Sequence, residues 1–257
     1  MANNRIGEKL QHLHRSGQKG LAWLIDPEKY PKPSQLKTTY NLDLCSKVDL
    51  ILIGGSLMVK SNMDSTLQML RNYSEEVPLV IFPGNVIQVS PYADGILFLS
   101  LISGRNPEFL IGQQVTAAPL IAHCRLEALA TAYLLIGGGE ISSVHYMSQS
   151  LPIPMNKPNI AMATALAGKY LGMNYFFLDA GSGSKTPVPS AIIRTVKKHT
   201  QSPILVGGGI DSLEKAKAAW EAGADLVVMG NGVEKNPGLL TEVLDYLQVF
   251  NVSLNIN

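Results

Sequence analysis

Three glycine clusters in the C-terminal part of the chain have the composition of a phosphate-binding site. They are AGSGSKTP (180–187), Gly207-Gly208-Gly209 and Gly230-Asn231-Gly232, and each follows an apolar run. Because glycine has no Cβ, successive backbone N–H groups can form a concave nest around an anion, and a helix N-terminus can point at the same group. Ser182 and Ser184 add hydroxyl donors. Tight turns also select glycine, but three clusters on successive loops favour phosphate binding.

A carboxylate and a hydroxyl end two apolar runs in the N-terminal part of the chain. Asp26 ends LAWLID and precedes Pro27, which holds it extended. Ser56 follows LILIGG. One carboxylate, one hydroxyl and the oxygens of a substrate phosphate suit Mg²⁺, which shares its ligands with phosphates. We therefore predict Mg²⁺ as a cofactor held by Asp26 and Ser56; the alternative for Asp26 is a helix N-cap.

A second carboxylate, Asp179, ends the run YFFLD next to the first glycine cluster. A carboxylate there can take the proton of a hydroxyl group on a phosphorylated substrate, which is the role of a general base. The alternative is a hydrogen bond that only orients the loop. We predict that Asp179 is catalytic.

Eight apolar runs alternate with helical patterns. The runs are continuous, which is typical of parallel strands covered by helices. We predict strands at 21–26, 50–55, 78–83, 95–101, the second half of 127–138, 175–181, 203–209 and 225–231. Helices are predicted at 33–47, 61–76, 106–116, 159–172, 188–200, 211–223 and 237–250, with the first twenty residues as a further helix across the barrel bottom. The pattern favours an α/β fold, a TIM (β/α)8 barrel, as one domain over residues 1–257.

Two connections depart from the regular pattern. The stretch GNVIQVSPYAD (84–94) is short and contains Pro91, so the third helix is expected to be modified or missing. The connection 137–159 is much longer than the usual loop after a strand, which indicates either a functional segment or a surface excursion. In a TIM barrel the active site lies where the strands end, and phosphate commonly binds after strands seven and eight. The three glycine clusters follow the predicted strands six, seven and eight.

Composition limits the classes of partner. The 257 residues carry a formal net charge of +1, which argues against nucleic-acid binding. Cys45 and Cys124 form no metal-binding or redox pair in sequence, and the polar N-terminus contains no apolar signal segment. We expect a cytoplasmic protein.

Five motifs in this order resemble the geranylgeranylglyceryl phosphate synthase family. They are LIDPEK, IGGS, FLDAGSG, VGGGI and MGNG, and the likeness extends from about residue 20 to residue 245. The chain is most similar to the second group of that family, and it also resembles the bacterial heptaprenylglyceryl phosphate synthases.

The resemblance implies a prenyltransferase. A polyprenyl chain, expected to be geranylgeranyl, would move from its diphosphate to the C3 hydroxyl of sn-glycerol 1-phosphate. It also implies Mg²⁺ on Asp26 and Ser56. The implied contacts of glycerol phosphate are Phe177, Leu178, Asp179, Ala180, Gly181, Ser182, Gly183, Gly208, Gly209, Gly230 and Asn231. The family often reads Tyr-Leu-Glu where this chain has Phe177-Leu178-Asp179, so one phenol is missing and the carboxylate is one methylene shorter.

A long isoprenoid needs an apolar groove, and we expect it beside the missing third helix, along 82–95 and 96–104. The resemblance further implies a homo-oligomer, dimer or hexamer, and the lipid product suggests a transient membrane contact. Two other functions stay open. One is a different phosphate-binding barrel, such as an isomerase, cyclase or epimerase. The other is a non-catalytic scaffold.

Overall fold

A closed parallel β-barrel forms the centre of the protein, in a computed structural model that describes residues 5–30, 32–55, 62–74, 76–137 and 142–254. The sheet order is β4-β3-β2-β1-β9-β8-β7-β5, and the pairing of β4 with β5 closes the ring. The strands are β1 Gly20–Ile25, β2 Leu50–Ile53, β3 Leu79–Ile81, β4 Gly95–Leu101, β5 Glu127–Gly137, β7 Tyr175–Asp179, β8 Ile204–Gly207 and β9 Leu226–Met229. A short strand, β6 Ile153–Pro154, pairs with the end of β5. The predicted TIM barrel is confirmed.

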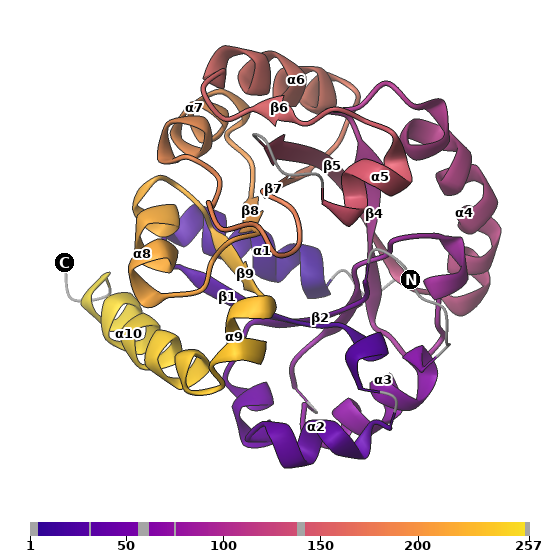
Figure 1. Ribbon diagram of the computed structural model, residues 1–257, viewed down its shortest axis with the longest axis vertical. Helices are drawn as coiled ribbons and strands as arrows, with labels where there is room; N and C mark the ends of the chain where they lie inside the picture. The colour runs from indigo at the N-terminus through magenta and orange to yellow at the C-terminus, as the bar shows by residue number, and fades with distance from the viewer. Residues whose placement is uncertain (1–4, 31, 56–61, 75, 138–141, 255–257) are drawn as a thin grey trace.

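Helices cover the outside of the barrel and one of its ends (Figure 1). They are α1 Arg5–Ser16, α2 Ser34–Thr39, α3 Met63–Arg71, α4 Gln113–Cys124, α5 Ser143–Ser148, α6 Pro158–Tyr170, α7 Ser190–Thr200, α8 Leu213–Glu221, α9 Asn231–Lys235 and α10 Gly238–Leu254. Among the described residues, none of these helices combines the length and the hydropathy that a membrane span requires.

Several predicted boundaries differ from the structure. The helix predicted at 33–47 is two pieces, α2 and a 3-10 helix at Leu42–Ser46, because Asn41 accepts a hydrogen bond from the N–H of Asp43 and starts a new turn. The helix predicted to end at 116 continues as α4 to Cys124, and β5 fills the whole of 127–137 rather than its second half. Local patterns place element centres better than element ends.

The segment between β3 and β4 contains no α-helix. Residues 82–94, all of which are described, hold only a 3-10 turn at Val86–Gln88. Asn85 starts this turn by accepting a hydrogen bond from the N–H of Ile87 at 3.1 Å. The prediction of a missing third helix is confirmed, and the outside of the barrel lacks its usual cover at this place.

The helix α1 closes the bottom of the barrel, as predicted. Its buried side chains Ile6, Leu10 and Leu13 belong to the same apolar cluster as the inward-facing strand residues. The buried carboxylate of Glu127, at the start of β5, accepts hydrogen bonds from the N–H groups of Ile6 and Gly7 at 2.9 and 2.8 Å. A negative charge at a helix N-terminus is stabilising, so Glu127 holds α1 against the strands.

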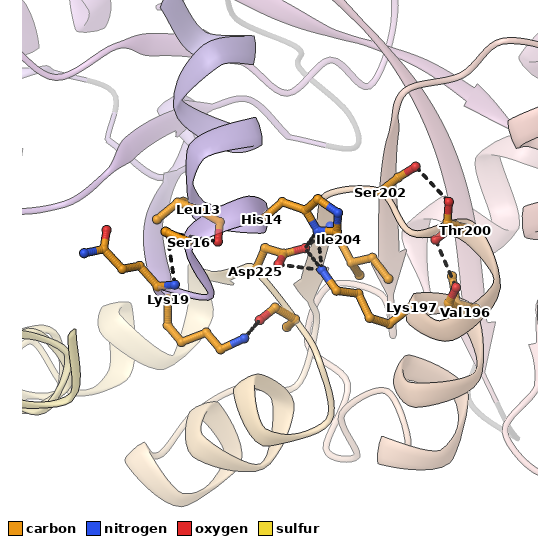
Figure 2. Close-up of polar contacts among 12 residues, drawn as sticks. Leu13, His14, Ser16, Lys19, Val196, Lys197, Thr200, Ser202, Ile204 and Asp225 are labelled. Carbon is orange, nitrogen blue, oxygen red and sulfur yellow. Dashed lines mark hydrogen bonds and ion pairs between the residues drawn. The ribbon is translucent and has the colours of Figure 1, made fainter. Parts of the chain in front are cut away.

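A polar cluster joins α1 and α7 to the strands at the same end (Figure 2). The buried carboxylate of Asp225 accepts hydrogen bonds from the ammonium of Lys197 at 2.5 Å and from the N–H of Ile204 at 2.7 Å. Lys197 also donates to Nδ1 of His14 at 2.6 Å. Nearby, Lys19 donates to the carbonyl of Ala224 at 3.1 Å, and burial lowers the pKa of its ammonium. The bottom of the barrel is thus fixed by charge as well as by apolar packing.

Candidate active site

A cavity of about 420 Å³ opens at the carboxyl ends of the strands. The residues that line it fall into two groups. A polar group contains the carboxylates and the glycine loops: Asp26, Asp179, Ser182, Gly183, Gly207, Gly208, Gly209, Gly230, Asn231 and Gly232. An apolar group lies toward β4 and α4 and includes Val86, Phe98, Phe109, Ala117 and Ile121. Residues from opposite ends of the sequence therefore share one space.

The polar end presents backbone N–H groups that have no acceptor in the protein. In the described part of the chain, the N–H groups of Ser182, Gly183, Gly208 and Gly209 donate to no backbone or side-chain oxygen. The neighbouring N–H of Ala180 is used within the barrel, where it donates to the carbonyl of Gly207 at 3.1 Å. Unpaired N–H groups that converge on a cavity form an anion-binding nest.

The pair Gly208 and Gly209 requires glycine for two reasons. Both have positive φ angles, of 78° and 70°, which other residues rarely adopt. A Cβ on Gly208 would lie 2.5 Å from Oδ1 of Asp179, and a Cβ on Gly209 would lie 2.9 Å from the backbone carbon of Thr186. The loop after β8 therefore packs backbone against backbone beside Asp179, a contact that a side chain would prevent.

The carboxylate of Asp179 is buried at the end of β7 and held by two donors. Oδ1 accepts the N–H of Gly181 at 2.8 Å, and Oδ2 accepts the hydroxyl of Tyr133 at 2.6 Å. Burial raises the pKa of Asp179, and the hydrogen bonds from Tyr133 and Gly181 oppose that rise. The loop-orienting hydrogen bond named as the alternative is present, in a carboxylate that also lines the cavity.

The other carboxylate, Asp26, lies half-buried across the cavity. Oδ1 caps the 3-10 turn Pro27–Lys29 by accepting the N–H of Glu28 at 3.1 Å, while Oδ2 meets no donor among the described residues. Burial raises the pKa of Asp26 more than this cap and the nearby Lys29 lower it. The predicted second ligand, Ser56, lies outside the described residues. Within them no three His, Cys, Asp or Glu side chains gather as a metal site, so further ligands would come from substrate phosphates.

The apolar end of the cavity lies where the third helix is missing. Val86 comes from the segment that replaces that helix, Phe98 from β4, and Ala117 and Ile121 from α4. The connection 137–159 contributes Val144 and Met147 of α5. The predicted apolar groove therefore exists beside the barrel, and it is continuous with the polar end of the cavity.

The predicted contact residues on β7 face two ways. Phe177 points into the barrel, where its ring stacks on Phe82 at 5.0 Å between centroids. Leu178 and Ala180 belong to the apolar core between sheet and helices, and neither lines the cavity, since side chains alternate along a strand.

Sequence reasoning assigned no role to Tyr133, Lys29 or Glu234, which also line the cavity. The ammonium of Lys29 donates to Glu234 at 2.6 Å and to Oδ1 of Asn231 at 3.1 Å. Asn231 in turn donates to Oγ of Ser182 at 3.4 Å, so the loops after β1, β7 and β9 are linked. A signal was present for Lys29, which lies in the motif LIDPEK beside Asp26.

Curated relatives match this chain over nearly its whole length. A protein named geranylgeranylglyceryl phosphate synthase from Spirosoma linguale is 45% identical over 245 residues, which cover 95% of this chain and 98% of the relative. A protein of the same name from Thermococcus gammatolerans is 37% identical over 254 residues, which cover 98% of this chain and 99% of the relative.

A solved structure has the same fold and carries a ligand. It is (S)-3-O-geranylgeranylglyceryl phosphate synthase from Thermoplasma acidophilum in complex with sn-glycerol-1-phosphate, with a TM-score of 0.85, 30% identity, and coverage of 94% of this chain and 97% of that one. The model of the PcrB family matches residues 16–247 of this chain. With relatives this similar over nearly its whole length, the chain belongs to the PcrB family.

Proposed function

We propose that the protein is a prenyltransferase that joins a geranylgeranyl chain to sn-glycerol 1-phosphate. The products are 3-O-(geranylgeranyl)-sn-glyceryl 1-phosphate and diphosphate. One observation carries the proposal: a single cavity connects unpaired backbone N–H groups to an apolar groove. The names of the relatives and the glycerol phosphate in the Thermoplasma acidophilum structure support the same reaction.

Glycerol phosphate fits the polar end of the cavity. Its phosphate would accept hydrogen bonds from the free N–H groups of the loops after β7 and β8. Gly230 and Asn231, in the loop after β9, line the same end of the cavity. A phosphate held there brings the glycerol hydroxyl groups toward Asp179, since the Gly208 loop packs directly against that carboxylate. Holding the acceptor in this way supplies much of the rate, because a bimolecular step becomes effectively unimolecular.

The prenyl donor fits the rest of the cavity. Its apolar chain would lie along Phe98, Phe109, Ala117 and Ile121, and its diphosphate near Asp26. Mg²⁺ prefers oxygen ligands, and Asp26, Ser56 and the diphosphate would together supply them. When bound, Mg²⁺ would neutralise the charge of the leaving diphosphate.

The reaction needs one bond made, one bond broken and one proton moved. The C3 hydroxyl oxygen of glycerol phosphate forms a bond to C1 of the prenyl chain, and the bond from C1 to the diphosphate oxygen breaks. The hydroxyl proton passes to the carboxylate of Asp179, which lies on the polar side of the cavity. Burial raises the pKa of Asp179, which makes it a stronger base than an exposed aspartate.

Family membership leaves the isomerase, cyclase, epimerase and scaffold alternatives without support. The remaining expectations belong to the proposal: Mg²⁺ dependence, a homo-oligomer, a cytoplasmic location and transient contact with a membrane that takes up the product. Light scattering tests the oligomer, and flotation with lipid vesicles in the presence of product tests the membrane contact.

The decisive experiment is incubation of the purified protein with sn-glycerol 1-phosphate, Mg²⁺ and labelled prenyl diphosphates of graded length. We expect an ether-linked product that resists alkaline hydrolysis, and no product from sn-glycerol 3-phosphate. The prenyl diphosphate that gives the highest kcat/KM identifies the prenyl chain length that the enzyme prefers. Absence of an ether product with every donor would overturn the proposed function.

A further inference from the structure

The inference concerns Tyr133, a residue of β5 whose hydroxyl contacts Asp179 of β7. The two strands pair in parallel, and the register places Tyr133 opposite Phe177 and Leu135 opposite Asp179. From this position the hydroxyl of Tyr133 donates to Oδ2 of Asp179 at 2.6 Å. Both residues are buried, and both line the cavity.

The ring of Tyr133 has little freedom to leave this contact. It packs edge-on against Phe82, with 6.1 Å between centroids, and against Phe177 at 5.6 Å. Phe82 and Phe177 stack on one another, so three aromatic rings form one packed group inside the barrel. A tyrosine hydroxyl that is buried in such surroundings needs a partner, and Asp179 provides it.

The carboxylate of Asp179 is therefore held from two sides. Gly181 donates to Oδ1 and Tyr133 donates to Oδ2. Each carboxylate oxygen can accept two hydrogen bonds, so each keeps a lone pair for a substrate. The two donors together set the direction in which those lone pairs point.

The same hydrogen bond affects the protonation of Asp179. Burial raises its pKa, and the Tyr133 hydroxyl, which bonds the charged form, is the largest influence that lowers it. The N–H of Gly181 acts in the same direction. Burial and the neighbouring carboxylate raise the pKa of Tyr133 well above its ordinary value, so Tyr133 stays a donor.

We propose that Tyr133 is a positioning residue for the transfer reaction: its hydroxyl orients Asp179 toward the C3 hydroxyl of glycerol phosphate and keeps the carboxylate able to accept that proton. This inference rests on the proposed function. It assigns a role in the reaction to a residue of β5. The glycine loops and Asp26, which the proposed function already uses, come from other strands.

The test compares Tyr133→Phe with the wild-type protein over a range of pH. Loss of the hydroxyl removes a hydrogen bond to a charged group, so we expect kcat to fall about 10- to 100-fold at neutral pH. The pKa of Asp179 should rise further, so the acidic limb of the pH profile of kcat/KM should move to higher pH, and part of the activity should return in alkaline buffer. The KM for the prenyl diphosphate should stay unchanged.

The matched control is Tyr175→Phe. Tyr175 lies at the start of β7, near Glu127 at the opposite end of the barrel from Asp179. This variant also loses one phenol from the same pair of strands, and it should keep the wild-type pH profile. An unchanged kcat and pH profile in Tyr133→Phe would overturn the inference. A loss that is equal at every pH and accompanied by a lower melting temperature would also overturn it, because packing alone would then explain the effect.

A second measurement separates this inference from the proposed function. Infrared difference spectra between acidic and neutral pH report the protonation of a buried carboxyl, and Asp179→Asn identifies its signal. We expect the Asp179 signal to titrate at higher pH in Tyr133→Phe than in the wild type. If the wild-type protein forms no ether product, the proposed function fails while the spectra still decide the Tyr133–Asp179 relationship. If it forms product and the signal titrates identically in both proteins, the inference alone fails.

Discussion

The ammonium of Lys29 lies 2.6 Å from the carboxylate of Glu234 and joins the loop after β1 to α9. The same ammonium donates to Asn231, which our proposal places at glycerol phosphate. Lys29 and Glu234 both line the cavity, as do the proposed metal ligand Asp26 and the glycine loops. In the proposed reaction Lys29 would have two roles: it would order Asn231, and it would place a positive charge near the anionic substrates.

The first prediction concerns Lys29→Met. We expect the KM for sn-glycerol 1-phosphate to rise by about 10-fold, since a charge-assisted hydrogen bond near the ligand is lost. The free energy of unfolding should change by about 1 kcal/mol, because the ammonium side chain of Lys29 is 40% exposed and ion pairs with an exposed partner contribute little. Steady-state kinetics and urea unfolding measure the two effects. The control is Lys9→Met, which breaks an ion pair with Asp49 at the bottom of the barrel; equal KM values in both variants would contradict the role of Lys29.

The second prediction concerns the metal. Treatment with EDTA should abolish product formation, and Mg²⁺ should restore it. Asp26→Asn should raise the Mg²⁺ concentration required for half-maximal rate by at least about 10-fold, because the charged ligand is lost. The exposed Asp245→Asn on α10 is the control. Full activity after metal removal would show that the protein transfers the prenyl chain without Mg²⁺.

The pH dependence of the proposed metal site follows from the burial of Asp26. The pKa of Asp26 is raised, so its carboxylate takes up a proton at higher pH than an exposed aspartate does. Protonation competes with metal binding, so the Mg²⁺ requirement should increase as pH falls through that raised pKa. Calorimetric titration with Mg²⁺ and a diphosphate at several pH values measures this. Gly55→Ala should weaken Mg²⁺ binding at every pH, since its Cβ would lie 2.8 Å from Oδ1 of Asp26.

The third prediction separates backbone strain from contact in the phosphate loop. Gly208→Ala should lower kcat/KM by about 100-fold or more, because the new Cβ would displace Asp179, and small displacements of catalytic groups have effects of that size. Gly172→Ala is the control: Gly172 has a φ of 86°, and its Cβ would meet no atom within 4 Å. Both variants should lose about 1 kcal/mol of stability from the strained backbone. Gly208→Ala should lose more stability than Gly172→Ala, because its Cβ would also lie 2.7 Å from the backbone nitrogen of Ala180. Kinetics and thermal unfolding therefore distinguish the two variants, and a Gly208→Ala enzyme with normal kcat/KM would contradict the contact.

The fourth prediction concerns the apolar groove. Ala117 on α4 is buried and lines the cavity, whereas Leu120 on the same helix is exposed. Ala117→Trp should fill the groove and shift the preferred donor to shorter prenyl diphosphates. Leu120→Trp should leave the preference unchanged. Competition assays with donors of different length measure the shift, and the same preference in both variants would place the prenyl chain elsewhere.

The fifth prediction concerns stability at the bottom of the barrel. Asp225→Ala should lower the free energy of unfolding by about 3 kcal/mol, because it leaves the half-buried ammonium of Lys197 and the N–H of Ile204 without an acceptor. Glu76→Ala removes an exposed ion pair with Arg5 and should change stability by less than about 1 kcal/mol. Urea unfolding measures both. The Asp225 variant should keep its kcat well below its melting temperature, since Asp225 does not line the cavity.

The barrel and its exposed glycine loops could be predicted from the sequence because their signals are local. Continuous apolar runs such as LILIGG predict covered parallel strands, and the glycines after β7, β8 and β9 mark turns where the backbone itself is exposed. Pro91 in a short connection was enough to predict the missing third helix, since proline and short length both oppose a helix there. These features depend on residues that are neighbours along the chain.

Other features depended on the closed barrel and could not be predicted in this way. Tyr133 and Asp179 are 46 residues apart, and Lys29 and Glu234 are 205 apart; each pair meets only because particular strands or loops become neighbours in a fixed register. The closed barrel also places Leu178 in the apolar core between the sheet and the helices, whereas Phe177 and Asp179 face the inside of the barrel. The sequence by itself determined the order of strands, helices and exposed glycines, because these follow from local periodicity. Tertiary structure alone decided which side chains contact Asp179 and Asn231, because those contacts arise when the ring of strands closes.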